Sequence, residues 1–341
     1  MYFVLRYDIL YGMEEQEQQP SARGSAEEEK QAKCKKVAAF FTDILRGVGI
    51  GVAFIIPGFS GGSVAAILGI YEKLVGAIAD IFKHFKKSVL TLLPIFIGML
   101  LGIAALIYPI QLGLRNFPIP TVSLFVGLAL GGIPSVTEKM KGGRVSWKHI
   151  LAFAIPLVAA AALCFLPLAG KVDLTSLHFG GYLLLIVIGA VGSCALVVPG
   201  ISGSMLLLIF GYYNSIVELI TVDLLHGQNV GVCFAVLACL AVGVIVGFFA
   251  ISVLMKFCLK RAPRGTHFAI LGFILGSIPA VFVSTLREAA SFENAEHLSA
   301  LMHSPWYWVV AAVLLLAGFA ASFCFVWFAK KKKKETKITE P

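Results

Sequence analysis

One short motif occurs twice in this chain, each time inside strongly apolar sequence. Residues 57–61 read PGFSG and residues 199–203 read PGISG, so equivalent positions differ by 142 (199 − 57). Proline rejects the interior of a helix, and glycine tolerates the turn that follows. A chain that crosses lipid avoids such breaks unless protein or a cavity surrounds them. A doubled, interrupted apolar segment is therefore the best sequence indication of a transporter binding site.

Composition places these apolar segments in a membrane. Hydrophobic residues make up 58% of the chain and charged residues 14%, and the mean hydropathy is +0.89. The charges are concentrated in short loops and both tails, which leaves long apolar runs. These features predict an all-α polytopic membrane protein, because a membrane β-barrel needs short alternating segments. The net charge is +9, and the basic residues lie beside apolar runs. We therefore attribute the excess of basic residues to membrane topology and to contact with lipid headgroups, and we expect no nucleic-acid partner.

Ten apolar segments are expected, and several are shorter than the bilayer requires. They are residues 44–56, 59–80, 91–110, 121–136, 148–168, 181–198, 201–222, 231–255, 267–284 and 305–329. The first segment spans only ~20 Å, whereas the hydrocarbon core is ~30 Å thick. We therefore expect this segment to be one arm of a re-entrant helical hairpin, which enters the bilayer and turns back at Pro57-Gly58.

The repeat extends beyond the motif. Residues 127–134 read GLALGGIP and residues 272–279 read GFILGSIP, an offset of 145 (272 − 127). Glycines four residues apart recur in equivalent segments and let helices approach closely in lipid; they are Gly98/Gly102, Gly127/Gly131, Gly243/Gly247 and Gly272/Gly276. We predict two five-segment repeats, at residues 41–170 and 171–329, each opening with a hairpin broken at PGxSG.

Lysine and arginine set the predicted topology. They cluster in the loops near residues 83–87, 139–148 and 256–264, and in the tail at 330–341. The positive-inside rule places these regions and both termini in the cytoplasm. Because each repeat has an odd number of segments, the second repeat is inverted, and the two hairpins enter from opposite faces. This arrangement is typical of alternating-access carriers. Residues 1–40 are expected to be a disordered cytoplasmic extension.

Each motif is followed by residues that can open a new helix. The first amides of a helix lack intrahelical partners and attract phosphate or carboxylate, and the serines add hydroxyl groups. The predicted phosphate-binding residues in the motifs are Ser60, Gly61, Gly62, Ser63, Ser202, Gly203 and Ser204, and the predicted turns are Pro57, Gly58, Pro199 and Gly200. The alternative interpretation is that these residues are helix caps and packing glycines without a ligand.

Ionisable residues near the motifs are few. Arg46 is predicted to bind the phosphate, and Lys73 also carries a charge that attracts an anionic headgroup. The candidates for coupling or gating are Tyr71, Glu72, Lys73, Tyr213, Asn214 and Glu218. A carboxylate can exchange a proton during a transport cycle, so a proton or sodium gradient is the expected energy source. The alternative is that Arg46, Glu72 and Lys73 only anchor helices at the interface.

Enzyme chemistry finds little support in the sequence. The seven histidines and seven cysteines form no paired cluster or CxxC motif, so neither a metal site nor another cofactor is expected. Filter-like sequence and rings of charge, which are typical of channels, are also missing. The sequence therefore favours a carrier over an enzyme.

The chain resembles the bacterial polyprenyl-phosphate (undecaprenyl-phosphate) transporter family over about residues 40–330. The shared pattern is Arg46, Gly47 and Gly51, then residues 56–63 (IPGFSGGS) and residues 69–74 (GIYEKL), with the second copy PGISGS. The chain departs from the pattern at Phe54 and Ile55, where the family often has a polar residue, and at Ser63, where threonine is common.

The resemblance implies translocation of undecaprenyl phosphate across the cytoplasmic membrane, which returns the lipid carrier to the inner leaflet. The opposed helix ends agree with this role because they can pass a phosphate while the isoprenoid chain stays in lipid. A carrier of a small soluble anion is the alternative, since the same loops could line a closed aqueous path.

Overall fold

The computed structural model describes residues 24–56, 59–166, 169–227, 229–291 and 300–338. Within these residues the regular secondary structure is entirely helical, as the sequence predicts. Seven of the described helices are long and apolar enough to cross a membrane, and an eighth span results if the bent pair Gly203–Ile209 and Tyr212–Leu224 is counted as one. The chain is therefore a multi-pass helical membrane protein.

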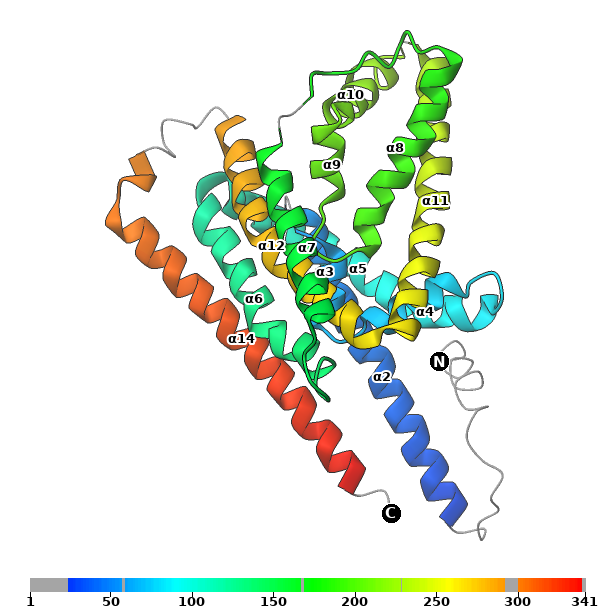
Figure 1. The fold of residues 1–341 in the computed structure, drawn as a ribbon, viewed down its shortest axis with the longest axis vertical. Coiled ribbons are helices and arrows are strands. Elements are labelled where there is room, and N and C mark those ends of the chain that lie inside the picture. The colour runs from blue at the N-terminus through cyan, green and yellow to red at the C-terminus, as the bar shows by residue number, and fades with distance from the viewer. Residues whose placement is uncertain (1–23, 57–58, 167–168, 228, 292–299, 339–341) are drawn as a thin grey trace.

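Figure 1 shows the arrangement of the described helices. They are α2 (Gly24–Ile55), α3 (Gly61–Ile67), α4 (Tyr71–Ala79), α5 (Phe85–Asn116), α6 (Pro118–Glu138), α7 (Trp147–Ala162), α8 (Phe179–Val197), α9 (Gly203–Ile209), α10 (Tyr212–Glu218), α11 (Val230–Arg261), α12 (Pro263–Ser291) and α14 (Pro305–Ile338). A 3-10 turn (Leu163–Phe165) follows α7, and a π-helix (Leu219–Leu224) follows α10.

Helix α2 is longer than the apolar segment predicted at 44–56. It begins at Gly24, within the stretch 1–40 that the sequence assigns to an N-terminal extension. Its apolar part, Val37–Ile55, has 19 residues and is long enough to cross the membrane, whereas the sequence predicted a short arm at 44–56. Residues 24–36 are rich in Ala, Glu, Lys and Gln, which are strong helix formers, and the helix therefore continues beyond the apolar segment. Residues 1–23 lie outside the described residues.

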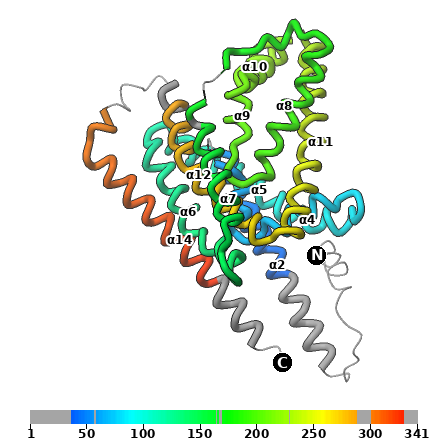
Figure 2. Tube along the Cα trace, in the orientation of Figure 1, coloured from blue at the N-terminus to red at the C-terminus, as the bar shows by residue number. Residues whose placement is uncertain are grey.

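Close glycine contacts join α2 to α5 and α8 to α11. A Cβ atom on Gly98 would lie 1.9 Å from the Ile44 carbonyl oxygen, and one on Gly243 would lie 2.1 Å from that of Ile186. The backbones approach so closely that only glycine fits at these positions. The tube in Figure 2 shows α8 and α11 running side by side. The predicted packing role of these glycines is confirmed.

Two further helix pairs join the halves of the chain. Helix α6 packs along α14, and α7 packs along α12. A Cβ atom on Gly127 would lie 2.0 Å from the Leu315 carbonyl oxygen, and one on Gly272 would lie 2.2 Å from that of Phe153. The last helix of each half therefore packs against the other half, and this exchange interlocks the two.

Helices α2 and α8 reach the centre of the molecule from opposite ends. In Figure 1, α2 rises from the lower end and α8 descends from the upper end, with α3 lying between them at the centre. A buried apolar cluster joins the two halves there and includes Ile70, Tyr71 and Val75 of the first half with Val197 and Ile270 of the second. The segments that follow α2 and α8 are thus brought together in the middle of the protein.

Candidate functional site

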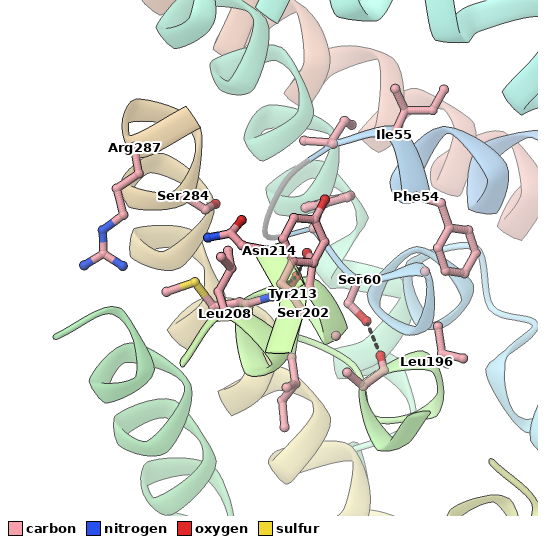
Figure 3. Close-up of a pocket in the computed structure, with 18 residues that line it drawn as sticks. Phe54, Ile55, Ser60, Leu196, Ser202, Leu208, Tyr213, Asn214, Ser284 and Arg287 are labelled. Atoms are coloured by element: carbon pink, nitrogen blue, oxygen red, sulfur yellow. Dashed lines mark hydrogen bonds between the residues drawn. The ribbon is translucent and has the colours of Figure 1, made fainter. Parts of the chain in front are cut away.

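The two motif segments line one central cavity of about 630 Å³. We call it the central cavity; Figure 3 shows its lining. Seven residues that the sequence singled out lie on its wall, namely Ser60, Gly61, Ser202, Gly203, Ser204, Tyr213 and Asn214. Segments 142 positions apart thus contribute hydroxyl and backbone groups to one space.

Hydrogen bonds hold the first motif segment against the end of α8. The Ser60 hydroxyl donates to the carbonyl oxygens of Ala195 and Val198, each at 3.4 Å. The buried Tyr71 hydroxyl donates to the Val197 carbonyl oxygen at 3.0 Å. These bonds satisfy carbonyl groups that lie at the end of α8, where intrahelical donors run out.

Gly62 lies directly against the end of α8 and the start of the second motif. A Cβ atom at this position would lie 2.9 Å from the Val197 carbonyl oxygen and 3.3 Å from the Pro199 nitrogen. Any side chain would therefore push the segments apart. Gly62 and Ser63 are both buried and are not among the residues that line the central cavity. The Ser63 hydroxyl has no hydrogen-bond partner among the described residues.

The second motif forms a tight turn. Gly200 has φ +82°, and a Cβ atom there would lie 2.2 Å from the Phe273 carbonyl oxygen. Both observations require glycine. Ser202 caps α9 by accepting a hydrogen bond from the Met205 amide at 3.5 Å, and its hydroxyl lies 3.0 Å from that of Ser204. The first predicted turn, Pro57-Gly58, lies outside the described residues.

Apolar side chains form most of the remaining wall. Phe54, Ile55 and Phe59 come from the first half, and Ile201 and Leu208 from the second. Phe54 and Ile55 are the positions at which the family often carries a polar residue, so apolar groups take that place in this cavity. The combination of hydroxyls and hydrocarbon suits an amphipathic ligand.

Arg287 is the one basic residue among the described residues that line the central cavity, and sequence reasoning missed it. It lies on α12 one turn after Ser284, which also lines the cavity. Figure 3 shows both residues on one side of the cavity, with Phe54 on the other. Position 142, its equivalent at an offset of 145 (287 − 145), is a glycine. A comparison of the two repeats could therefore not detect it.

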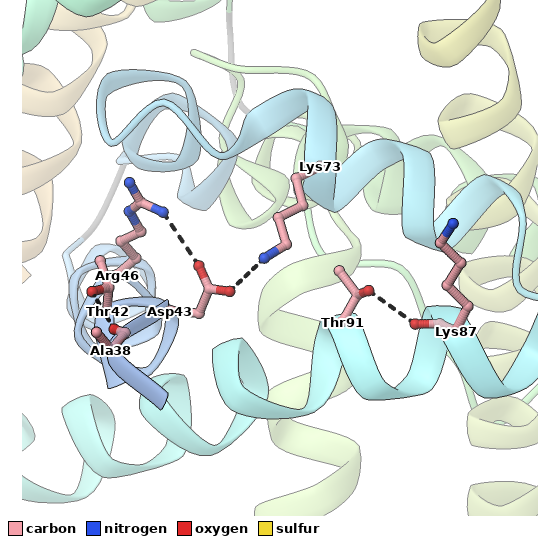
Figure 4. A network of polar contacts seen from close by, with 7 residues as sticks. All are labelled: Ala38, Thr42, Asp43, Arg46, Lys73, Lys87 and Thr91. Atoms are coloured by element: carbon pink, nitrogen blue, oxygen red, sulfur yellow. Dashed lines mark hydrogen bonds and ion pairs between the residues drawn. The ribbon is translucent and has the colours of Figure 1, made fainter. Parts of the chain in front are cut away.

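Arg46 and Lys73 share a buried carboxylate instead of lining the central cavity. The Arg46 Nη1 atom lies 3.3 Å from Asp43 Oδ1, and the Lys73 Nζ atom lies 2.5 Å from Asp43 Oδ2 (Figure 4). The Asp43 side chain is only 2% exposed. A buried carboxylate requires a paired cation. Both basic residues therefore have a structural role as partners of Asp43. Sequence reasoning did not consider Asp43, although its spacing of three residues from Arg46 indicates a helical ion pair.

We expect Arg46→Gln to lower the melting temperature while the folded protein keeps its transport rate within about threefold. The loss of one charged partner of Asp43 costs about 1–3 kcal/mol of folding free energy. Thermal melting and a lipid transport assay on the same preparation test this expectation. Lost transport at an unchanged melting temperature would restore the phosphate-binding role predicted from the sequence.

The two predicted carboxylates also have partners outside the central cavity. Glu72 lies 2.7 Å from Lys139 Nζ and 3.2 Å from His267 Nε2. Glu218 forms an exposed pair with Lys171 at 2.7 Å. Among the described residues, no group of three or more His, Cys, Asp or Glu residues could hold a metal ion.

The fold and the central cavity define a class: a multi-pass helical membrane transporter in which two interrupted apolar segments meet. More specifically, the chain belongs to the undecaprenyl phosphate translocase-like family, which it matches over residues 50–298. This is a family of transporters and not of enzymes.

Two characterised relatives carry the same name. The polyprenyl-phosphate transporter of Vibrio cholerae is 27% identical over 329 residues, which cover 87% of this chain and 99% of that protein. The polyprenyl-phosphate transporter of Staphylococcus aureus is 30% identical over 248 residues, which cover 70% of this chain and 85% of that protein. No solved structure matches the chain.

Proposed function

We propose that this chain translocates undecaprenyl phosphate across the bacterial cytoplasmic membrane and returns it to the inner leaflet. Family membership gives the substrate class. The observation that carries the proposal is that both PGxSG segments line the same central cavity. The headgroup passes between these segments while the isoprenoid chain remains in apolar surroundings.

Hydroxyl groups and one guanidinium form the proposed headgroup site. Ser60, Ser202 and Ser204 offer hydroxyls, and the segments at Gly61 and Gly203 bring backbone close to the cavity. Helices α3 and α9 have only seven residues each, so their dipoles are short and most of the charge must come from a side chain. A phosphate monoester carries about −1.5 to −2 charges at neutral pH. Arg287 supplies a planar donor group that suits phosphate.

A neighbouring apolar cavity can take up part of the isoprenoid chain. It has a volume of about 370 Å³, shares Phe59 with the central cavity and is bounded by residues of α2, α6 and α14, including Val52, Phe125 and Phe325. Its described lining contains no charged residue. A small soluble anion would gain no binding energy from an apolar cavity of this kind. This observation favours the lipid over the soluble-anion alternative.

We further propose that residues 41–170 and 171–329 are inverted repeats that operate by alternating access. The order of a long helix, two short helices and a 32-residue helix occurs in both halves. The exchange of α7 and α14 between the halves supports the same relation. Helices α2 and α14 extend toward the same end of the molecule in Figure 1, in agreement with two cytoplasmic termini and a basic tail at 330–341.

Ion pairs gather at the end of the protein where the basic loops lie. Asp80 pairs with Lys256, and Glu72 pairs with Lys139, so α4 is tied to α11 and to the end of α6. We propose that these pairs close the cytoplasmic side in this conformation, and that Tyr71, Tyr213 and Asn214 act in gating. Glu72 or Glu218 is the proposed proton-exchange group if a proton gradient drives transport; sodium is the other option.

Tyr71→Phe is expected to slow transport about fivefold. The change removes the hydrogen bond from the Tyr71 hydroxyl to the Val197 carbonyl oxygen, which contributes about 1 kcal/mol. Its loss weakens the contact between the two halves in this conformation. Tyr108→Phe is the matched control, because Tyr108 is 73% exposed on α5. Equal rates for both variants would show that the Tyr71 contact has no part in the cycle.

Leaflet-specific labelling of undecaprenyl phosphate in vesicles tests the proposed function. Vesicles with the purified protein should move the lipid between leaflets faster than protein-free vesicles, and imposed proton and sodium gradients identify the coupling ion. Equal rates with and without the protein would overturn the proposal. Efflux of trapped inorganic phosphate from the same vesicles, without lipid movement, would instead establish the soluble-anion alternative.

A further inference from the structure

A second large cavity also borders the segment that contains the Pro199 turn. It has a volume of about 680 Å³ and is formed by the start of α7, the end of α11 and the start of α12. We call it the basic cavity. Its lining includes Val198 and Pro199, whereas Ala195, Leu196 and Ile201 line the central cavity. One short stretch of backbone, residues 195–201, therefore contributes to the lining of both cavities.

The basic cavity combines hydrocarbon walls with cations. Apolar side chains such as Met255, Phe257 and Phe273 line it, together with Lys148, Arg261 and Arg264, and no acidic residue is present among its described lining residues. The three cations come from the two loops that the positive-inside rule assigns to the cytoplasm. Apolar walls with a purely basic edge match a lipid that has an anionic headgroup.

The three cations differ in what they already bind. The Arg264 guanidinium donates to the carbonyl oxygens of Met140 at 3.1 Å and Gly143 at 3.2 Å, and so fixes the loop after α6. Lys148 lies 6.0 Å from the centre of the Trp147 ring, a weak contact at an exposed site. Arg261 is exposed in the last turn of α11. Lys148 and Arg261 can therefore turn toward a headgroup without breaking the structure.

We infer that the basic cavity is a second binding site for the polyprenyl phosphate, which the lipid occupies on the cytoplasmic side of the Pro199 turn. This inference rests on the proposed function. Residues 195–201 contribute to the lining of both cavities, so we infer that a headgroup that leaves the central cavity past this turn enters the basic cavity. A phosphate monoester carries about −1.5 to −2 charges, more than the single charge of a phosphodiester lipid. The cluster of cations thus favours the transported lipid over bulk phospholipid.

Photolabelling of the full-length protein in nanodiscs tests the inference. The probe is a polyprenyl phosphate with a diazirine in its isoprenoid chain, and peptide mass spectrometry locates the labelled residues. We expect labelling around Phe54 and Phe59 of the central cavity, and around Met255 and Phe257 of the basic cavity. Labelling of the central cavity alone would overturn this inference but keep the proposed function. Labelling of neither cavity would overturn both.

Charge variants identify what holds the headgroup. Lys148→Gln with Arg261→Gln should lower labelling of the basic cavity about 25-fold, because each cation near an anionic lipid group contributes a factor of about five. Labelling of the central cavity in the same variant should stay unchanged, which also reports that the protein is folded. Lys83→Gln with Lys86→Gln removes two exposed cations from another basic loop and should leave both cavities labelled. An equal loss in this control would contradict a specific site.

Competition decides the identity of the lipid. Unlabelled undecaprenyl phosphate should displace the probe from the basic cavity at concentrations at which phosphatidylglycerol, a phosphodiester lipid, has little effect. Equal displacement by the two lipids would show a general anionic-lipid site and would overturn the assignment to the transported lipid.

Discussion

Arg287→Gln is expected to slow undecaprenyl phosphate transport by about ten- to a hundredfold. Within the described part of the chain, Arg287 is the one basic residue that lines the central cavity, and a hydrogen bond to a charged group contributes about 1.5–3 kcal/mol. Glutamine keeps a polar group but is shorter than arginine, and it loses the charge and the paired donors that match phosphate. The transport rate in vesicles and the affinity for undecaprenyl phosphate should fall together.

Two further variants separate headgroup binding from a general effect of charge. Arg287→Lys keeps the charge without the planar donor group, and should retain an intermediate rate. Arg115→Gln removes an exposed cation from the last turn of α5, at the opposite end of this helix from the basic loop at 83–87, and should transport normally. Wild-type transport by Arg287→Gln, or an equal loss in Arg115→Gln, would remove Arg287 from the proposed site.

Gly62→Val is expected to abolish detectable transport. The valine Cβ atom would lie 2.9 Å from the Val197 carbonyl oxygen. Its nearest neighbours are all backbone atoms of residues 197 and 199, which cannot rotate away as a side chain can. The two motif segments must therefore separate. Overpacking of this kind costs about 1–3 kcal/mol, and the melting temperature should fall as well. Gly62→Ala adds only the Cβ atom and should remain folded while losing most of its transport.

Gly76→Val is the matched control for this series. Gly76 lies on α4 fourteen positions away (76 − 62), and a Cβ atom there would meet nothing within 4 Å. Its transport rate and melting temperature should stay close to those of the wild type. Folded Gly62→Val protein with normal transport would show that close contact between the two halves is unnecessary.

The sequence predicted the central part of the site because the motif is duplicated. Ser60 and Ser202 occupy equivalent positions, and the structure places both on one cavity wall. Arg287 occurs in the second half alone, so no comparison of the repeats could reveal it. Asp43 was missed because Arg46 and Lys73 were interpreted as groups that attract the headgroup, with interface anchors as the alternative, whereas the structure pairs both with the buried Asp43 carboxylate.

For the helices as well, the sequence predicted some features of the structure and not others. Spaced glycines such as Gly98 and Gly127 predicted close helix contacts, and the structure confirms them. Spacing identifies the face of a helix but not its neighbour, so the exchange of α7 and α14 between the halves could not be predicted. The length of α2 was underestimated because hydropathy marks the apolar segment, whereas helix propensity extends the helix through the charged residues 24–36.

Protection of engineered cysteines by substrate tests the central claim, that both motif segments bind one headgroup. Phe59 and Ile201 are the variable residues of the two PGxSG copies, and both line the central cavity. In a chain with its seven native cysteines replaced, Phe59→Cys and Ile201→Cys are each exposed to a thiol reagent, with Val145→Cys in the exposed loop before α7 as the control. Undecaprenyl phosphate should slow modification of both cavity positions over the same concentration range and leave position 145 unaffected. Protection of only one cavity position, or of neither, would contradict a shared site between the two halves.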